Sequence, residues 1–292
     1  MNKINKSIPN SPKVYKPSAP FPAVVRENRR LTPVQSPDDI RHIVLDLSGS
    51  GISYLEGQSI GIIPPGTDEN GKAYRVRLYS VSSSRKGDDG KDSTVSLTVK
   101  RVVAADPVTG QIVKGIASNY FCDALPGDEI LITGPTGRSF FIPEDESVDI
   151  IMVAVGTGIA PFRAFIQQIY KIRQSWSGRI RLFFGTKTGM ESLYCNDENN
   201  DIGQYFDTQT FKAFRALYNI EGAFIQRRVE ENIEEIWRII RDENFSFYIC
   251  GLKELETGIE EILNERARQD NLHWEELRNR FKEEGRWNVE VY

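Results

Sequence analysis

The chain has 292 residues, of which 39% are hydrophobic and 27% charged, and its formal net charge is −4 at pH 7. This composition is typical of a soluble globular protein with two ordinary domains or one large one, and the acidic balance argues against bulk nucleic-acid binding. No apolar run approaches the roughly 20 residues that cross a bilayer. The polar, proline-bearing residues 1–20 lack the apolar core of a secretory signal, and we expect them to form a flexible arm.

Cysteine and histidine are scarce. The three cysteines, Cys122, Cys195 and Cys250, form no CxxC spacing, which favours a reducing compartment and argues against a disulfide framework or a zinc or iron–sulfur site. The two histidines are too few for a His-rich metal centre. The sequence therefore predicts a cytoplasmic protein without a bound metal.

Residues 21 to about 141 have the pattern of short strands. Their segments are rich in β-branched and aromatic residues, and turn clusters such as PPGTDENG separate them. Such a series predicts an antiparallel barrel or sandwich. The expected strands are 41–47, 57–64, 75–82, 94–103 and 128–134.

After about Glu144, buried strands alternate with helices. The strands expected are 149–155, 179–185 and 245–251, and the helices expected are 162–174, 232–243 and 258–269. This alternation predicts a doubly wound parallel sheet. The boundary falls near Pro143–Val148, so we expect domains at 21–147 and 148–292.

Three motifs carry residues suited to phosphates and rings. In GTGIAP (Gly156–Pro161), glycines let the backbone approach a phosphate at a helix N-terminus, although an ordinary strand-to-helix turn is the alternative. In RLYS, Arg77 and Tyr79 share one face of a strand, so a guanidinium that can hold a phosphate lies beside a ring that can stack. The plainer interpretation is that Tyr79 is a half-buried tyrosine of the barrel. After Gly115, we expect Ser118 or Asn119 to cap a helix, whose N-terminus offers a second site for a phosphate. A capped helix without a ligand is the alternative.

Two further features lie near the end of the chain. Cys250 ends a buried strand, where open α/β sheets bind ligands, although a small core residue is the plainer interpretation. If 288–292 is extended, Glu290 and Tyr292 share one face, and a carboxylate and a phenol lie side by side. A plain edge strand is the alternative. The residues expected on the opposite, apolar face are Trp287, Val289 and Val291.

Taken together, these motifs resemble the plant-type ferredoxin–NADP⁺ reductase family from about residue 20 to the last residue. The resemblance implies an FAD-binding antiparallel β-barrel domain followed by an NADP-binding α/β domain. It also implies electron transfer between NADP(H) and ferredoxin or flavodoxin, with hydride transfer between nicotinamide C4 and flavin N5. The segments that carry it are RLYSVSS, LTVKRV, VKGIASNYFCD, LPGDEILITGPTG, GTGIAPFRAF, YICGLKELETGI and WNVEVY.

The resemblance implies roles for individual residues. Arg77 would bind the FAD pyrophosphate, and Tyr79 and Tyr292 would stack on the two faces of the isoalloxazine, Tyr292 until the nicotinamide displaces it. Ser80 would lie near flavin N5, and Glu290 would relay a proton or act electrostatically. The residues implied to be catalytic are Ser80, Cys250, Glu290 and Tyr292. Those implied to bind FAD are Arg77, Leu78, Tyr79, Ser80, Lys100, Gly115, Ile116, Ala117, Ser118, Thr157 and Tyr292.

The implied nucleotide site departs from the family in part. Arg215 and Gln226 match the family, whereas Phe214, Gly222 and Phe224 replace its serine, basic residue and stacking tyrosine. NADP(H) is the expected substrate, and NAD(H) is the alternative. The residues implied to bind NADP are Thr157, Gly158, Pro161, Arg215, Phe224, Gln226, Cys250, Gly251 and Leu252. Three basic residues could supply the positive charge that a 2′-phosphate requires, and the alternative is that they are ordinary solvated surface residues. They are Lys212, Arg227 and Arg228.

A second departure concerns the adenine of FAD. Val103 takes the place of a tyrosine that stacks on it in the family, so we expect weaker FAD binding or a different adenine pose. Segment 194–217 also resembles the reductase subunit of the benzoyl-CoA epoxidase system, whose iron–sulfur cysteines this chain lacks. A reductase component of an oxygenase is therefore an alternative, and a non-catalytic nucleotide-binding module is another.

The carrier is expected to be acidic. We expect a monomer in which basic residues near the flavin edge steer this partner into place. The residues expected to do so are Arg29, Arg30, Arg85, Lys86, Lys100 and Arg101.

Overall fold

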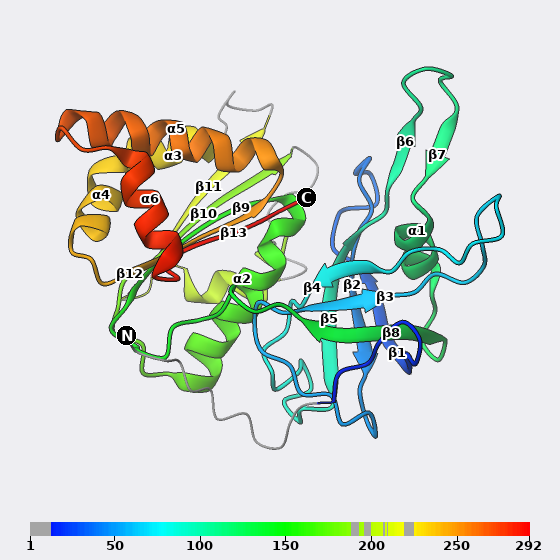
Figure 1. Ribbon diagram of the computed structural model, residues 1–292. Coiled ribbons are helices and arrows are strands. Elements are labelled where there is room, and N and C mark those ends of the chain that lie inside the picture. Colours follow the sequence, from blue (N-terminus) through cyan, green and yellow to red (C-terminus); the bar gives the residue numbers. More distant parts are fainter. Residues whose placement is uncertain (1–12, 188–192, 196–199, 207, 209, 219–224) are drawn as a thin grey trace.

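The computed structural model describes residues 13–187, 193–195, 200–206, 208, 210–218 and 225–292. An antiparallel sheet and a parallel sheet with helices lie side by side, and the carboxyl end of the chain faces the antiparallel part (Figure 1). Within the described ranges, no helix is long and apolar enough to span a membrane.

The antiparallel sheet has six strands in the order β4-β3-β8-β1-β2-β5. Its two ends meet, because Val81 forms a bridge with Leu97 and the Ser82 N–H donates to the Ser96 carbonyl at 2.7 Å. The sheet therefore closes into the barrel that the sequence predicted. The strands are β1 (Phe21–Arg30), β2 (Ile40–Asp46), β3 (Ser59–Ile62), β4 (Arg77–Ser80), β5 (Thr94–Lys100) and β8 (Glu129–Thr136).

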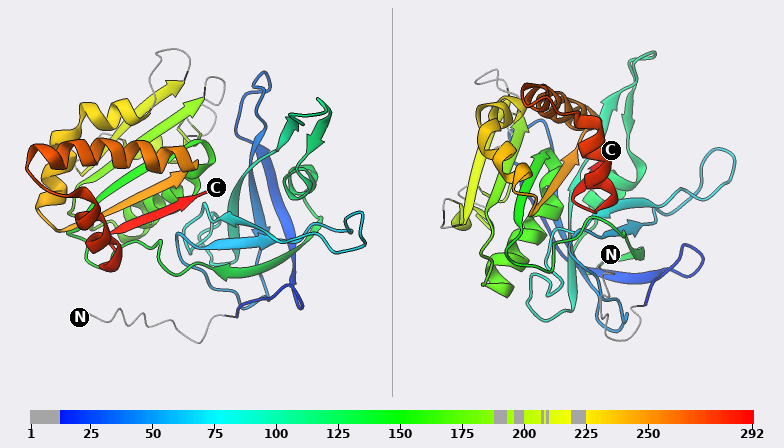
Figure 2. Two further views of the ribbon diagram at one scale, coloured as in Figure 1. Left: turned by 45° about the horizontal axis from the view of Figure 1, so that its top comes forward. Right: turned by 60° about the vertical axis from the view of Figure 1, so that its left-hand side comes forward.

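Alternating apolar side chains fill the barrel. Ile43 and Leu45 of β2 are fully buried, as are Val95, Leu97 and Val99 of β5, so the period of two places one face of each strand inside. The expected strand 94–103 is interrupted at Arg101. Beyond it, β6 (Val103–Ala105) and β7 (Ile112–Lys114) form a hairpin that projects from the barrel with all six residues exposed (Figure 2).

The parallel sheet has the order β11-β10-β9-β12-β13, and every pair in it is parallel. Side chains of the central strand alternate between two cores: Met152 packs with α2, and Ile151 and Val153 pack with α3 to α6. Helices therefore cover both faces, which confirms the doubly wound sheet. The strands are β9 (Asp149–Val155), β10 (Ile180–Lys187), β11 (Phe211–Tyr218), β12 (Phe245–Gly251) and β13 (Trp287–Val291). The helices are α2 (Ile159–Ile166), which continues as the π-helical η2 (Gln167–Arg173), α3 (Ile225–Glu231), α4 (Ile233–Arg241), α5 (Lys253–Gln269) and α6 (Trp274–Glu283).

The strand order creates a topological switch point, and we refer to the carboxyl edge of the sheet at this point as the crevice. The chain leaves β9 on one side to form β10 and β11, and returns to form β12 and β13 on the other side. The connections after β9 and β12 therefore diverge, and a ligand site is expected at such a switch point, at the carboxyl ends of the strands. The short η1 (Gly156–Gly158) follows β9 directly, and Leu252 follows β12.

A buried arginine joins the two sheets. Arg163 of α2 is 3% exposed, and its guanidinium donates to the Ser82 carbonyl at 2.6 Å, to Asp88 at 3.0 Å and to Asp201 at 2.9 Å. His42 of β2 lies 2.9 Å from the other Asp88 oxygen. Burial alone would raise the pKa of Asp88, but Arg163 and His42 hold it well below its usual range. The barrel and the parallel sheet therefore share one ionised network.

We expect Arg163→Ala to lower the free energy of unfolding by about 3–5 kcal/mol, because it removes a buried cation and leaves the partly buried carboxylates of Asp88 and Asp201 without their partner. Arg268→Ala is the matched control, since Arg268 is mostly exposed and its one ion pair among the described residues is with the exposed Glu265, and it should cost less than about 1 kcal/mol. Urea denaturation of the two variants gives both values. Equal losses in the two variants would contradict this account of the junction.

Candidate functional site

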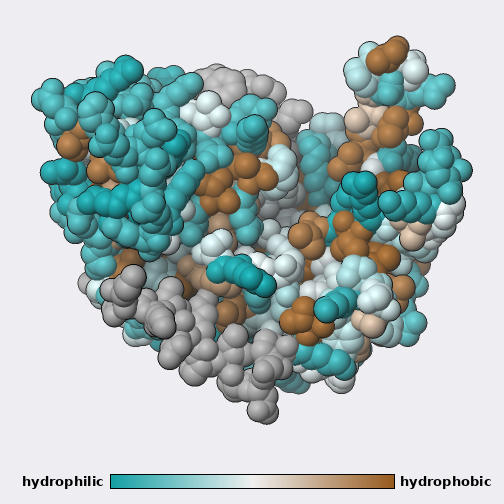
Figure 3. Space-filling view, in the orientation of Figure 1, coloured by the Kyte–Doolittle hydropathy of each residue, from teal (hydrophilic) through white to brown (hydrophobic). Residues whose placement is uncertain are grey.

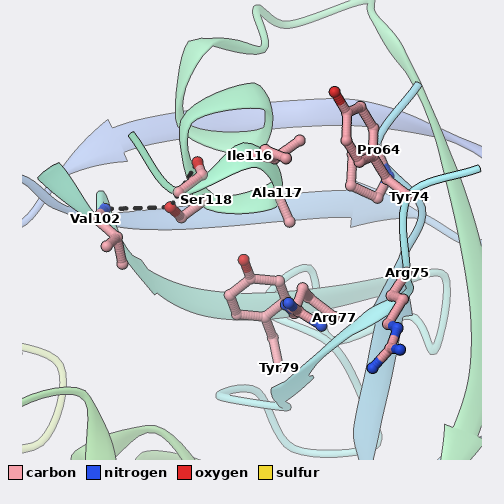
Figure 4. A pocket seen from close by; sticks show the side chains of 10 residues that line it. Pro64, Tyr74, Arg75, Arg77, Tyr79, Val102, Ile116, Ala117 and Ser118 are labelled. Atoms are coloured by element: carbon pink, nitrogen blue, oxygen red, sulfur yellow. Dashed lines mark hydrogen bonds between the residues drawn. The ribbon is translucent and has the colours of Figure 1, made fainter. Parts of the chain in front are cut away.

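A cavity of about 310 Å³ opens on the barrel between β4 and α1 (Ile116–Asp123) (Figure 4). It brings together six of the residues implied to bind FAD: Arg77, Tyr79, Gly115, Ile116, Ala117 and Ser118. Four residues that the sequence motifs did not single out complete its lining: Pro64, Tyr74, Arg75 and Val102. We refer to this space as the barrel pocket.

The barrel pocket has the charge and the flat surface that a phosphate-linked ring needs. Within the described part of the chain, neither Arg75 nor Arg77 has a carboxylate partner, and both are exposed. Tyr79 is half-buried, and its ring packs against Phe121 with the centroids 5.9 Å apart. Pairing of β4 with β3 fixes Arg77 and Tyr79 on one face, as the strand period predicted.

The start of α1 differs from the expectation. The helix begins at Ile116 with Gly115 as its N-cap, so the predicted cap at Ser118 or Asn119 is wrong. The Ser118 hydroxyl instead accepts a hydrogen bond from the Val102 N–H at 3.1 Å. No side chain caps this helix, so its first backbone N–H groups are left for an anion in the barrel pocket.

Five residues implied to bind FAD lie outside the lining of the barrel pocket. Ser80, Thr157 and Tyr292 belong to the cluster described next, and the other two are Leu78 and Lys100. Leu78 lies on the face of β4 opposite to Arg77 and Tyr79 and is 60% exposed. The Lys100 ammonium forms an ion pair with Asp38 at 2.6 Å. A lysine at that position is therefore already neutralised, which the sequence alone could not reveal.

The four residues implied to be catalytic meet where the barrel touches the crevice. The Ser80 hydroxyl donates to Glu290 Oε2 at 3.4 Å, and Glu290 lies beside Cys250 in the register of β12 and β13. The Tyr292 N–H donates to the Gly251 carbonyl at 3.0 Å. The Tyr292 hydroxyl lies 2.6 Å from Thr157 Oγ1, so the phenol is tied to the connection after β9.

The last strand follows the predicted alternation. Trp287 is 4% exposed and stacks on Phe247 with the ring centroids 4.6 Å apart, and Val289 packs in the same core. This apolar row holds β13 in place, and Glu290 faces the barrel. The Tyr292 side chain, by contrast, is 65% exposed.

Burial governs the protonation of the catalytic cluster. It raises the pKa of Glu290 to about 7, although the hydrogen bond from Ser80 opposes this rise. Burial and then the neighbouring Glu290 carboxylate raise the pKa of the Cys250 thiol well above its usual range. At neutral pH the cluster therefore holds a neutral thiol and a carboxyl group that exchanges its proton readily.

Two glycines shape the crevice. A Cβ on Gly158 would lie 2.0 Å from the Cys250 carbonyl oxygen, so only glycine allows the connection after β9 to lie this close to the end of β12. Gly251 has a φ of +151°, a conformation that other residues rarely adopt. Together they let the connection after β9 lie close against the end of β12 at the switch point.

Of the remaining residues implied to bind NADP, Leu252 directly follows Gly251 at the switch point, and the others lie elsewhere in the chain. Arg215 lies within β11, three residues before its end, and its guanidinium lies over the Phe206 ring, 5.8 Å from the centroid. Gln226 lies in the first turn of α3, and Pro161 is buried in α2. Gly222 and Phe224 lie outside the described residues.

The aromatic and basic residues around this region are engaged elsewhere. Phe214 stacks on Phe183, with centroids 4.6 Å apart. Arg227 and Arg228 both form ion pairs with Glu231 on their own helix. Of the compensating cations, Lys212 is exposed on β11 without a carboxylate partner in the described chain.

Comparisons with known proteins agree with this geometry. Residues 152–261 match the family model of the oxidoreductase NAD-binding domain. The chain is 41% identical over 287 residues to a ferredoxin–NADP reductase of Spirulina sp, covering 96% of this chain and 97% of that protein. It is 40% identical to the chloroplastic leaf isozyme 1 of ferredoxin–NADP reductase from Arabidopsis thaliana, covering 95% of this chain and 79% of that protein.

The fold is also that of solved structures. The ferredoxin–NADP⁺ reductase of Plasmodium falciparum superimposes with a TM-score of 0.75 at 23% identity, covering 95% of this chain and 98% of that one. A barrel followed by a doubly wound sheet is thus the shared architecture.

The raised pKa of Glu290 predicts a specific pH dependence of stability. Because the folded state holds the Glu290 proton more tightly than the unfolded state, the wild type loses stability as pH rises from about 4.5 to 7. Glu290→Gln removes this loss, so its stability relative to wild type should rise by roughly 2–3 kcal/mol over that window. Urea denaturation at several pH values, with both proteins in the same flavin state, measures this. A constant difference between them would contradict the assignment.

Proposed function

The chain belongs to the ferredoxin–NADP reductase family, and we propose from this that it transfers electrons between NADP(H) and ferredoxin, with FAD as its cofactor. The observation that supports the proposal most directly is the hydrogen bond between Ser80 and Glu290. Tyr79 precedes Ser80 in β4, and Tyr292 follows Glu290 by two residues, so this bond brings two tyrosines to the same junction from opposite domains. A planar ring bound between these tyrosines would lie beside the catalytic cluster.

The residues of the barrel pocket fit FAD. Two unpaired guanidiniums and the uncapped N-terminus of α1 suit a pyrophosphate, and Tyr79 offers a ring face for stacking. Arg77 and the first N–H groups of α1 hold the pyrophosphate in this proposal. When bound, FAD supplies the exchange between hydride and single-electron chemistry.

The crevice would receive the nicotinamide. Thr157 and Gly158 line it on one side, and Cys250 and Gly251 on the other, with backbone groups close enough to orient the ring. The neutral Cys250 thiol adds no charge next to a cationic nicotinamide. Glu290 holds an exchangeable proton beside Ser80, which suits a group that passes protons toward the reacting ring.

The structure changes the choice of residues that would dock the carrier. All six cations expected to steer it are paired: Arg29 with Glu27, Arg30 and Arg101 with Asp39, Arg85 with Glu56, Lys86 with Asp92 and Lys100 with Asp38. Arg75 lines the barrel pocket instead, and in the described chain no carboxylate neutralises it, whereas Leu78 is an exposed apolar residue of the adjoining strand β4. We therefore place the docking surface for an acidic carrier, ferredoxin or flavodoxin, around these two residues.

Two further features of the protein are proposals of the same kind. The described cysteines are all free, which supports a reducing cytoplasmic location. We also propose that the protein acts as a monomer, because Ser80, Glu290 and Tyr292 all come from one chain.

An oxygenase reductase that uses NADH is the second candidate. The residue next to Arg215 favours it, because Phe214 stands in place of the family's serine, stacks on Phe183 and offers no hydroxyl to a 2′-phosphate.

The deciding experiment combines flavin spectroscopy with electron transfer. The purified holoprotein should show flavin absorbance, be reduced faster by NADPH than by NADH, and reduce cytochrome c only when ferredoxin is present. The KM for ferredoxin should rise with ionic strength, because screening weakens the attraction to Arg75. Equal or faster reduction by NADH would favour the second candidate. Absence of transfer to any one-electron carrier would refute the proposal.

Tyr292→Ser should tighten NADP⁺ binding by roughly ten-fold and slow turnover, because no phenol then competes for the nicotinamide position and product leaves more slowly. Tyr292→Phe is the control: it keeps the ring and loses the hydroxyl contacts with Thr157 and the Gly158 backbone, so its affinity should stay closer to wild type than that of the serine variant. Titration calorimetry with NADP⁺ measures both. An unchanged affinity in the serine variant would show that Tyr292 does not occupy the nicotinamide position.

A further inference from the structure

The barrel pocket contains a second aromatic ring that the catalytic proposal does not use. Tyr74 is half-buried beside Pro64 on one wall, and Ile116 and Ala117 lie across the pocket from it (Figure 4). Its ring is also held over Gly66, where a Cβ would lie 3.4 Å from the ring edge. In the described chain, the Tyr74 hydroxyl has no hydrogen-bond partner, so the ring is fixed while its polar end remains available.

The hairpin beyond β5 offers no comparable surface. Val103 replaces the family's adenine-stacking tyrosine; it is 50% exposed and does not line the barrel pocket. Ala104, Ala105, Ile112 and Val113 complete an aliphatic ribbon without an aromatic ring. In Figure 3, the hydrophobic surface of this ribbon continues down to the base of the hairpin beside α1. A purine placed on the hairpin would find side-chain methyl groups but no ring face.

The kinds of group that line the pocket match the kinds of group in FAD. FAD has two ring systems joined through a pyrophosphate, and the lining has two tyrosines, Tyr79 and Tyr74, with Arg77 between them in the chain. Tyr79 is assigned to the isoalloxazine and Arg77 to the pyrophosphate. Tyr74 is then the one other aromatic ring among the residues that line the described cavity, and the adenine is the one ring system without a partner.

We propose that the AMP half of FAD folds back toward Tyr74 and Pro64, so that the adenine stacks on Tyr74 instead of lying over the β6–β7 hairpin. This inference rests on the proposed function, since it takes FAD as the cofactor. In this pose Pro64 and Ile116 cover the edge of the adenine. The Tyr74 hydroxyl can form a hydrogen bond with the ribose or with the adenine.

Comparison of FAD with FMN tests this directly, because FMN lacks the AMP half. Apoprotein carrying Tyr74→Leu, which keeps apolar volume but removes the ring, should bind FAD about ten-fold more weakly than wild type, the size of base–aromatic stacking. Its FMN affinity should stay unchanged. Tyr74→Phe should retain FAD affinity within about three-fold, the size of one lost neutral hydrogen bond. Flavin fluorescence quenching gives all of these dissociation constants.

Val103→Ala is the matched control on the hairpin and should leave FAD affinity unchanged. The inference is overturned if Tyr74→Leu binds FAD as wild type does, if it weakens FAD and FMN equally, or if Val103→Ala weakens FAD selectively. Circular dichroism of each apoprotein verifies the fold, and Tyr74→Met, which also removes the ring, replaces the leucine variant if that variant does not fold. Wild-type protein that binds neither flavin would refute the proposed function, whereas wild-type FAD binding with no effect of Tyr74 would refute this inference alone.

Discussion

The buried guanidinium of Arg163 is the contact on which the relative position of the two domains depends. It reaches from α2 to the barrel through the Ser82 carbonyl and Asp88, and Asp201 satisfies its remaining charge. Burying one cation is costly unless its hydrogen bonds are complete, so an altered domain angle would leave donors or carboxylates unpaired. A single domain arrangement is therefore strongly preferred over neighbouring ones.

This constraint has consequences at the catalytic cluster. Ser80 belongs to the barrel and Glu290 to the last strand, and their hydrogen bond is long, at 3.4 Å. A bond of that length contributes little to holding two domains together. The Arg163 network supplies the rigidity, and the cluster is positioned by it. Separation of these tasks leaves Tyr292 exposed and held only through its hydroxyl and backbone contacts in the described chain, whereas the strand that carries it is anchored by Trp287 in the core.

The sequence was informative where local periodicity and motif chemistry agree. The buried run 149–155 and the alternation in 94–100 predicted β9 and β5, and RLYS placed Arg77 and Tyr79 on one face. The strand β1 was not expected, because FPAVVRENRR carries charges that only the closed barrel explains: Ala23 and Val25 point inside, and the arginines point outward to acidic partners. The barrel closes through a bridge between residues 81 and 97, and no local sequence pattern predicts a pairing between residues so far apart in the chain.

The same limit applies to charge. From the sequence, six basic residues formed an attractive field for an acidic carrier, yet each has a carboxylate beside it, and for Arg101 and Lys100 these are Asp39 and Asp38 from a distant loop. A count of lysines and arginines does not show which of them form ion pairs. Tyr74 shows the converse case: its sequence context has no motif, and only the loop that joins β3 to β4 brings its ring to the wall opposite α1. Recognition at this pocket therefore depends on which charges and rings remain unpaired after folding, a property of the tertiary structure that residue types alone do not determine.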